Sequence, residues 1–201
     1  MAEQEKVGVS GDGLAIRRGE RLLFEDLSFT ANAGDYVEIR GANGAGKTSL
    51  LRAIAGFLRP SAGRISFENA AEPTLGLHYL GHLNGLKGSV SARAHMRYWA
   101  GLLGGDGAIE PAAAELGVTA LMDLPVRVLS QGQQRRVSLT RLLIARRPVW
   151  LLDEPAAALD SAGRGIVASL ISAQCALGGV VFAAVHEPLG PSPTQTLALS
   201  R

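Results

Sequence analysis

The sequence predicts an α/β domain built around a mainly parallel sheet. Short, continuously apolar runs at 149–152 and 180–185 are typical of strands that are buried on both faces. A glycine-rich segment at 41–48 separates an expected strand at 36–40 from an expected helix at 47–57. The length of 201 residues, of which 47% are hydrophobic, allows one core and is too short for two full domains.

Short strands joined by turns are expected in the first third of the chain and again near its end. Gly19 stands in the connection between the first two of these runs, and Ala33-Gly34-Asp35 forms a turn into the strand at 36–40. Besides the strands already named, the expected ones are 14–17, 27–30, 64–67, 77–80 and an edge strand at 196–199.

The middle of the chain predicts helices instead. We expect helices at 91–103 and 111–116, and a longer one that Ser130 caps and that runs to about residue 146. A further helix begins at Asp160 after the strand at 149–152. We expect Ile166, Leu170, Ala173 and Leu177 to lie along one face of this helix. The sequence therefore predicts a helical insert between two stretches of sheet.

Composition narrows the possible classes of protein. The net charge of +2 comes mostly from scattered arginines and gives no argument for nucleic acid as a partner. The single Cys175 excludes an internal disulfide and fits a reducing compartment. No apolar run reaches the ~18–20 residues that cross a bilayer, and residues 1–10 are polar, unlike a secretory signal. We therefore expect a cytosolic chain, or one attached to a membrane through a partner.

Residues 41–48 match the pattern G-x-x-x-x-G-K-[ST] between a strand and a helix. The glycines let backbone N–H groups turn inward around phosphate oxygens, and the helix N-terminus adds partial positive charge. Lys47 can reach the β- and γ-phosphates, and the Thr48 hydroxyl can ligate Mg²⁺. The sequence thus predicts a bound triphosphate, with candidate contacts at Gly41, Ala42, Asn43, Gly44, Ala45, Gly46, Lys47, Thr48 and Ser49.

Two carboxylates follow the apolar strand at 149–152. At a strand end beside the phosphate loop, Asp153 is placed to hold Mg²⁺, directly or through water. Glu154 points elsewhere, so we expect it to orient and polarise the attacking water. The candidate metal ligands are therefore Thr48 and Asp153, and Glu154 is the candidate base.

A second anion site is expected where Ser130 begins the long helix. Ser130, Gly132 and Gln133 offer a hydroxyl, a glycine amide and a helix N-terminus. Because one triphosphate already has its cradle at 41–48, this second site is most useful if it closes over the nucleotide of a neighbouring chain.

These motifs together resemble the nucleotide-binding domains of ATP-binding cassette (ABC) proteins. GANGAGKT at 41–48 looks like their Walker A motif, LLDE at 151–154 like Walker B, and LSQGQ at 129–133 like their signature. Asp160 looks like the end of the D-loop, and His186 looks like the switch histidine. By resemblance, His186 contacts the γ-phosphate, Asp160 communicates across a dimer, and the ligands are ATP and Mg²⁺.

The resemblance also implies an architecture. It is that of a P-loop NTPase of the ABC nucleotide-binding type, with a RecA-like core, an N-terminal antiparallel β subdomain and an inserted α-helical subdomain. The whole chain, 1–201, would be one ABC ATPase domain, with its core at about 1–82 and 148–201 and its helical insert at about 83–147.

Three positions depart from the family pattern. Gln131 replaces a glycine of the signature, which is tolerable if its side chain points away from the nucleotide. His82 stands where the family has the Q-loop glutamine, and its charge would vary near neutral pH. The aromatic residue that stacks on adenine falls near Arg17-Arg18, so we expect Arg18 to stack on the base.

Within the family, three stretches are similar to ATP-binding subunits that serve haem export in c-type cytochrome biogenesis: 24–56, 81–87 and 129–142. This resemblance implies a homodimer on the cytoplasmic face of the bacterial inner membrane, with integral membrane partners resembling CcmB and CcmC. ATP hydrolysis would drive haem export or the release of a haem-loaded chaperone. No arrangement of His, Cys or Met here requires haem contact, and we predict that the chain binds no haem directly.

Other assignments stay open at this point. Another two-component exporter, for lipid, polysaccharide or drug, would have the same biochemistry and a different membrane partner. A soluble ABC ATPase acting on DNA or ribosomes usually carries two cassettes, coiled-coil inserts or basic arms, and this chain has one cassette and a modest insert. A P-loop GTPase would carry an N-K-x-D motif, which the sequence lacks, and would leave LSQGQ unexplained.

Overall fold

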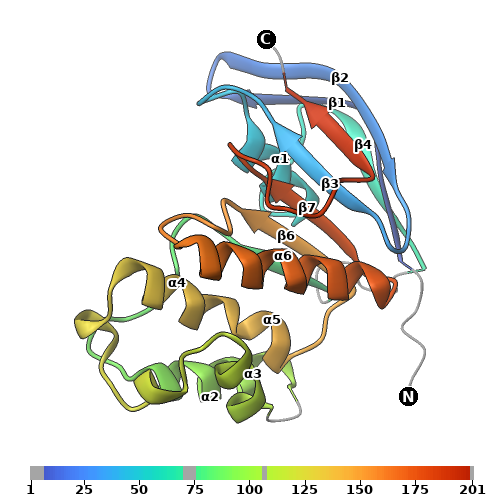
Figure 1. The fold of residues 1–201 in the computed structure, drawn as a ribbon. Helices are drawn as coiled ribbons and strands as arrows, with labels where there is room; N and C mark the ends of the chain where they lie inside the picture. Colours follow the sequence, from blue (N-terminus) through green and yellow to red (C-terminus); the bar gives the residue numbers. More distant parts are fainter. Residues whose placement is uncertain (1–6, 70–75, 106–107, 200–201) are drawn as a thin grey trace.

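The strands form two sheets (Figure 1). The helix α1 (Lys47–Ile54) packs in an apolar core to which both sheets contribute residues. The structure, a computed structural model, describes residues 7–69, 76–105 and 108–199. The antiparallel sheet has the order β2 (Arg21–Ala31), β1 (Gly8–Arg18), β4 (Ala62–Glu68). The parallel sheet has the order β5 (Leu77–Leu80), β6 (Val149–Asp153), β7 (Val180–Ala184), β3 (Tyr36–Arg40), β8 (Gln195–Ala198).

β1 and β2 form a hairpin around the predicted connection at Gly19. Gly19 has φ 60°, a conformation that favours glycine, and Arg18 pairs with Arg21 across the turn. Both strands are much longer than the expected runs at 14–17 and 27–30, because they pair with each other along their length and β1 also pairs with β4. The predicted N-terminal antiparallel sheet is confirmed.

The strands of the parallel sheet lie within one residue of their predicted bounds. The sequence identifies them well because β6 and β7 are central strands, buried at every residue, and therefore appear as unbroken apolar runs. The expected edge strand at 196–199 is confirmed as β8, which among the described strands pairs only with β3.

Alternate residues of the central strands face two separate apolar cores. Trp150 and Leu152 face the core that contains α6 and the helices of the middle of the chain. Leu151 and Phe182 face the opposite core, where α1 and the antiparallel sheet pack. The alternation places the parallel sheet between two layers and leaves its strand ends free to carry a site.

The other described helices lie between β5 and β7 in the chain. Their bounds are α2 (Ala92–Leu103), α3 (Ile109–Glu115), α4 (Gln131–Leu139), α5 (Arg141–Ile144) and α6 (Ser161–Ala176), with 3₁₀ turns at Thr119–Leu121 and Val126–Val128. Figure 1 shows α6 against the parallel sheet, and α2 to α5 gathered on the side of α6 that faces away from it. α1 ends at Ile54, three residues before its predicted end, because Gly56 takes φ 77° and turns the chain.

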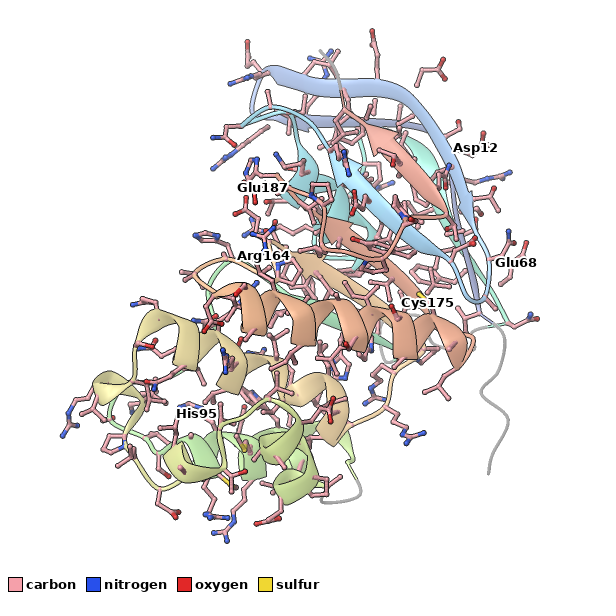
Figure 2. The ribbon with its side chains drawn as sticks, in the orientation of Figure 1. Asp12, Glu68, His95, Arg164, Cys175 and Glu187 are labelled. Carbon is pink, nitrogen blue, oxygen red and sulfur yellow. The ribbon has the colours of Figure 1, made fainter. Side chains whose placement is uncertain are left out.

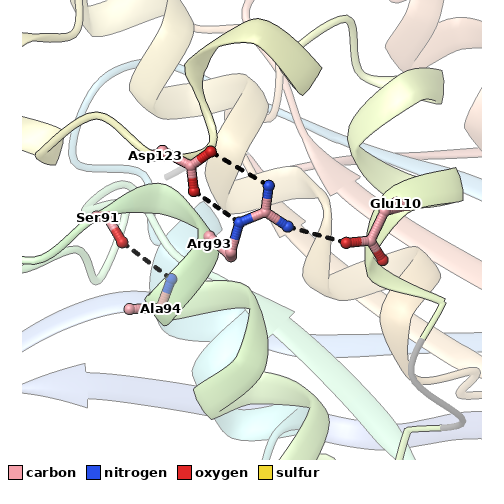
Figure 3. Close-up of polar contacts among 5 residues, drawn as sticks. All are labelled: Ser91, Arg93, Ala94, Glu110 and Asp123. Atoms are coloured by element: carbon pink, nitrogen blue, oxygen red, sulfur yellow. Dashed lines mark hydrogen bonds and ion pairs between the residues drawn. The ribbon is translucent and has the colours of Figure 1, made fainter.

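One arginine connects the helices of the middle segment at the surface (Figure 3). The Arg93 guanidinium bonds to Asp123 at 2.7 Å and to Glu110, in α3, at 2.9 Å. Ser91, expected as the first helical residue, is the N-cap of α2, because its Oγ accepts a hydrogen bond from the Ala94 N–H at 3.3 Å. These polar contacts fix the start of α2 relative to α3.

The single long helix expected from Ser130 to about residue 146 is wrong. The structure has two helices, α4 and α5, that meet at Thr140. Side chains donate to the carbonyls that a continuous helix would use: Thr140 Oγ1 bonds to Val137 O at 2.7 Å, and Arg141 Nε to Ser138 O at 2.9 Å. Such local side-chain bonds compete with the helical ladder and interrupt it.

The apolar face expected for the helix after Asp160 holds at Leu170, which is buried, and at Ile166, which packs partly buried against the same core, but not at its other two residues. Ala173 and Leu177 are exposed, and the buried face of α6 consists of Gly163, Val167, Leu170, Ile171 and Gln174. Gln174 is buried because its amide donates to the carbonyl oxygens of Arg147, at 2.8 Å, and Pro148, at 3.2 Å. A buried polar residue of this kind interrupts the apolar pattern from which the face was predicted.

Within the described ranges, no helix combines the length and the apolar character needed to span a membrane. Residues 1–6, which supply most of the polar N-terminal segment, lie outside the described residues.

Candidate functional site

The loop at 41–48 leaves β3 and enters α1 through glycines with left-handed backbones. Gly44 and Gly46 have φ 79° and 110°. A Cβ on Gly41 would lie 2.7 Å from Leu199 O, and one on Gly46 would lie 3.0 Å from ring carbons of Phe24. The loop can therefore take this path only with glycine at these positions, and successive amides of such a glycine-rich turn can surround an anion.

Lys47 is the first residue of α1 and is 7% exposed. Its Nζ donates to Gly41 O at 2.7 Å and to Ala42 O at 3.4 Å. These bonds hold the ammonium group across the mouth of the loop, where phosphate oxygens could replace the carbonyls as its partners.

Thr48 and Asp153 meet at the carboxyl end of β6. The Thr48 hydroxyl donates to Asp153 Oδ2 at 2.9 Å, and Asp153 is 4% exposed. A hydroxyl and a carboxylate are the oxygen donors that Mg²⁺ prefers, and Mg²⁺ typically takes few protein ligands together with phosphate oxygens and water. The two side chains therefore fit a magnesium ion bound with a nucleotide.

Glu154 has a left-handed backbone, with φ 49°, which is costly for a residue other than glycine. Its N–H donates to Ala184 O at 3.0 Å, so the strained residue is fixed to the end of β7. Its carboxylate lies 2.8 Å from His186 Nε2, and both side chains are partly exposed. The structure thus brings together the predicted base and the predicted switch histidine.

A cavity of about 320 Å³ lies over the phosphate loop. Its lining contains nine residues of the predicted set: Arg18, Ala42, Asn43, Gly44, Gly46, Lys47, Thr48, Ser49 and Glu154. Two lining residues, Arg21 and Leu23, were not predicted. The sequence carried a signal for Arg21, because a hairpin turning at Gly19 places Arg21 opposite Arg18.

Glu154 also lines a second hollow of about 270 Å³, together with residues 155–159 and His186. Arg164 and Glu187, which Figure 2 labels, also line this hollow, and they form an ion pair with an N–O distance of 3.0 Å. Glu154 therefore stands between the phosphate loop and the segment that leads to Asp160.

Ser130, Gly132 and Gln133 do not line the cavity over the phosphate loop of their own chain. Ser130 and Gln133 form a capping box, in which Ser130 Oγ accepts from Gln133 N at 3.2 Å and Gln133 Oε1 accepts from Ser130 N at 2.9 Å. Gly132 packs so tightly on the segment before α6 that a Cβ would lie 2.8 Å from Ala158 O.

Asp160 caps α6 and contacts α4. Its Oδ1 accepts from Gly163 N at 2.8 Å and pairs with Arg136 at 2.7 Å. These bonds, first from the Gly163 amide and then from Arg136, lower the pKa of Asp160 below its usual range. Asp160 is thus joined to the helix that Ser130 begins, apart from the lining of the phosphate-loop cavity.

His82 and Gln131 have exposed side chains. His82 lies in the loop after β5 and lines neither of the two cavities at Glu154. Whether the Gln131 side chain points away from a nucleotide stays a prediction, because Ser130, the expected contact beside it, is exposed as well.

Comparison with known proteins extends over most of the chain. The pattern of the family described as ABC transporter matches residues 24–157. The cytochrome c biogenesis ATP-binding export protein CcmA of Rhodopseudomonas palustris (strain BisB5) is 47% identical over 187 residues, 90% of this chain and 93% of that protein. CcmA of Rhizobium meliloti (strain 1021) is 41% identical over 199 residues, 94% and 96% of the two chains.

Among solved structures, a putative ABC transporter ATP-binding protein from Pyrococcus furiosus superposes with a TM-score of 0.84. The match covers 96% of this chain and 97% of that one at 23% identity, so it supports the fold alone. The family match and the relatives at 39–47% identity show the family as well as the fold. The chain belongs to the ABC transporter family, and it is an ATPase.

Proposed function

We propose that the chain is the ATP-hydrolysing subunit of a membrane ABC complex in c-type cytochrome biogenesis, where it drives haem export or release of a haem-loaded chaperone. The observation that carries this proposal is the identity of 39–47% to proteins named CcmA over at least 90% of this chain. Similarity of that extent cannot be confined to the nucleotide motifs, because it includes most of the helical middle of the chain.

The site geometry supports a role for each residue around Mg-ATP. Lys47 neutralises phosphate charge, while Thr48 and Asp153 hold Mg²⁺. Bound Mg-ATP supplies the phosphoryl group that is transferred to water. Glu154 orients the attacking water as its base, and His186, already 2.8 Å from Glu154, steadies the γ-phosphate.

The active form in this proposal is a homodimer with two nucleotides between the copies. Ser130, Gly132 and Gln133 of one copy close over the phosphate loop of the other. In favour of this, the three residues lie outside the lining of their own phosphate-loop cavity. Asp160, which pairs with Arg136 of α4, connects the closing helix to the segment beside Glu154. Arg18, in the lining of the cavity, stacks on the base.

Integral membrane subunits resembling CcmB and CcmC are the proposed partners, at the cytoplasmic face of the bacterial inner membrane. The proposed contact surface lies around His82 and the helical insert, which we place at about 83–147 between core segments at about 1–82 and 148–201. Leu83, beside His82, supports this choice because 84% of its surface is exposed, the largest fraction among the large apolar residues that the structure describes, so its side chain is available for contact with another protein.

Deletion of the gene, followed by staining for covalent haem, tests the biological role. We expect all c-type cytochromes to be lost while other exporters keep their activity. Unchanged cytochromes would contradict the proposal and favour an exporter with another cargo.

Glu154→Gln tests the assignment of the base. The variant keeps the shape and hydrogen bonding of the side chain and removes its basicity, so we expect it to retain ATP and to favour the closed dimer. Turnover and nucleotide retention are measured on the purified complex. Normal turnover by Glu154→Gln would refute the role of this carboxylate.

A further inference from the structure

Arg135 lies in α4, five residues after Ser130, and is 2% exposed. Its guanidinium makes five hydrogen bonds, and none of them is to a carboxylate. Three go to the last residue of β6 and the two residues after it: Nη2 to the carbonyl oxygens of Asp153 and Glu154, both at 2.8 Å, and Nε to Pro155 O at 3.1 Å. The side chain therefore contacts the backbone of the candidate metal ligand, Asp153, and of the candidate base, Glu154.

The other two bonds go to the loop after β5. Nη1 of Arg135 donates to Gly81 O at 3.0 Å and to Asn84 Oδ1 at 3.2 Å. These residues flank His82, whose own side chain is exposed. The connection between this loop and the carboxylates is thus made by an arginine of α4, and not by the side chain at position 82.

Every N–H donor of the Arg135 guanidinium has a hydrogen-bond partner. An arginine has five N–H donors, and the structure gives five bonds. Burial is the main cause that lowers the pKa of Arg135 to about 10, which still leaves it charged at neutral pH. A buried cation whose donors are all satisfied by backbone carbonyls and one amide holds those acceptors in a fixed arrangement.

The consequence for Glu154 follows from its two peptide groups. Its N–H is bonded to Ala184 O in β7, and its carbonyl is bonded to Arg135. With both sides held, the residue keeps its strained φ of 49°, and the direction of its carboxylate is set. Without Arg135, the carbonyl side of the residue would be free to relax.

We propose that Arg135 is a positioning residue for ATP hydrolysis, which fixes the backbone of Asp153 and Glu154 to α4 and to the loop at 81–84. A displacement of α4, the helix whose first turn would cover a partner's nucleotide, is transmitted through this guanidinium to the base. This inference deepens the proposed function and rests on the role given there to Glu154.

Arg141 supplies a matched control. It is also an arginine whose pKa burial lowers to about 10, and it also holds the loop after β5, by donating to Asn84 O. Its guanidinium lies 4.3 Å from the centre of the Trp99 ring and bonds to Ser138 O. It makes no bond to residues 153–155, so its replacement disturbs the same helices without releasing Glu154.

The experiment compares Arg135→Gln with Arg141→Gln in the full chain purified with its membrane subunits. For Arg135→Gln we expect kcat to fall on the order of 10–100-fold, with the KM for Mg-ATP changed by less than about threefold, because orientation is lost and binding is kept. For Arg141→Gln we expect kcat within about threefold of the parent. Adding Arg135→Gln to Glu154→Gln should lower the residual turnover no further.

Wild-type kcat in folded Arg135→Gln, or an equal loss of kcat in Arg141→Gln, would overturn the inference. If Arg135→Gln does not fold, Arg135→Lys replaces it. That variant keeps the charge with three donors, and its kcat should fall by a smaller factor; an unchanged kcat overturns the inference here too. Failure of the proposed function is seen separately, as normal turnover by Glu154→Gln alone.

Discussion

His78 lies in β5 with 3% of its surface exposed, and its Nε2 is 2.6 Å from Ala145 O. Burial is the main cause that lowers the pKa of His78 to about 4. Arg147 and Arg141 lower it further, while the hydrogen bond to Ala145 opposes the shift. The ring is therefore neutral in the folded protein, and its N–H is satisfied by the carbonyl.

A pH dependence of stability follows from His78. As pH falls below about 6.5, the unfolded chain gains a proton that the folded chain does not bind until about pH 4. The free energy of unfolding should fall across this window, by at most about 1.4 kcal/mol per pH unit from this residue. The change in the free energy of unfolding is measured by urea unfolding of the parent and of His78→Gln at pH 7.5 and 5.0.

We expect a weaker pH dependence in His78→Gln than in the parent. His82→Ala, which removes an exposed histidine, is the control and should keep the parent's dependence. Equal slopes in the parent and in His78→Gln would show that another group controls acid stability.

Lys47→Ala removes the ammonium group that is held against Gly41 O and Ala42 O. We expect turnover of Mg-ATP to fall on the order of 10²-fold, because a fixed positive charge at the phosphates is lost. Lys87→Ala removes an exposed lysine and is the control. Turnover and nucleotide affinity of the purified complex are compared, and a Lys47→Ala enzyme as active as Lys87→Ala would contradict the role of this residue.

At the scale of elements, α4 and the segment before α6 are packed on each other by their backbones. Gly132 leaves no room for a Cβ beside Ala158 O, and Arg136 and Asp160 join the same two elements through charge. Ala158 has φ 62°, so this segment is also strained where it meets the helix. The start of α4 therefore cannot move without moving the chain between Glu154 and α6.

Gly132→Ala should destabilise the fold by about 1–3 kcal/mol, because the added methyl group meets a backbone oxygen that cannot rotate away. Gly165→Ala is the matched control within α6. Nothing lies within 4 Å of a Cβ added at Gly165, so the higher helix propensity of alanine should stabilise the fold by about 0.5–1 kcal/mol. Urea unfolding of both variants tests the pair, and equal effects would exclude the tight contact at Ala158.

At the scale of the whole molecule, the proposed dimer brings Ser130 of one copy to the phosphate loop of the other. Ser130→Cys combined with Asn43→Cys should cross-link between copies when Mg-ATP is added in the Glu154→Gln background. Cys175 competes little with the introduced cysteines for disulfide formation, because burial raises its pKa to about 11 and keeps it a thiol. Cross-linked dimers are measured on a denaturing gel.

Two controls complete this experiment. Omission of nucleotide should abolish the cross-link, and Gly165→Cys in place of Ser130→Cys should not form it. Cross-linking that is independent of nucleotide, or none at all with Mg-ATP, would contradict a nucleotide-bridged dimer.

Much of the fold could be predicted because its signals are local. The glycines and Lys47 of the phosphate loop, the hairpin at Gly19 and the apolar strands β6 and β7 each follow from neighbouring residues, whose backbone preferences and alternation act over a few positions. The order of the motifs then predicted the ABC family, which the comparisons confirm.

The sequence by itself thus determined the elements, the phosphate loop and the family. Only the tertiary structure decided that α4 ends at Leu139, that Gln174 is buried in α6, and that Arg135 holds the backbone of Glu154. The physical reason is that these features depend on hydrogen bonds and close packing, in the last two cases with carbonyl groups from distant parts of the chain. No local pattern encodes where such a carbonyl will lie.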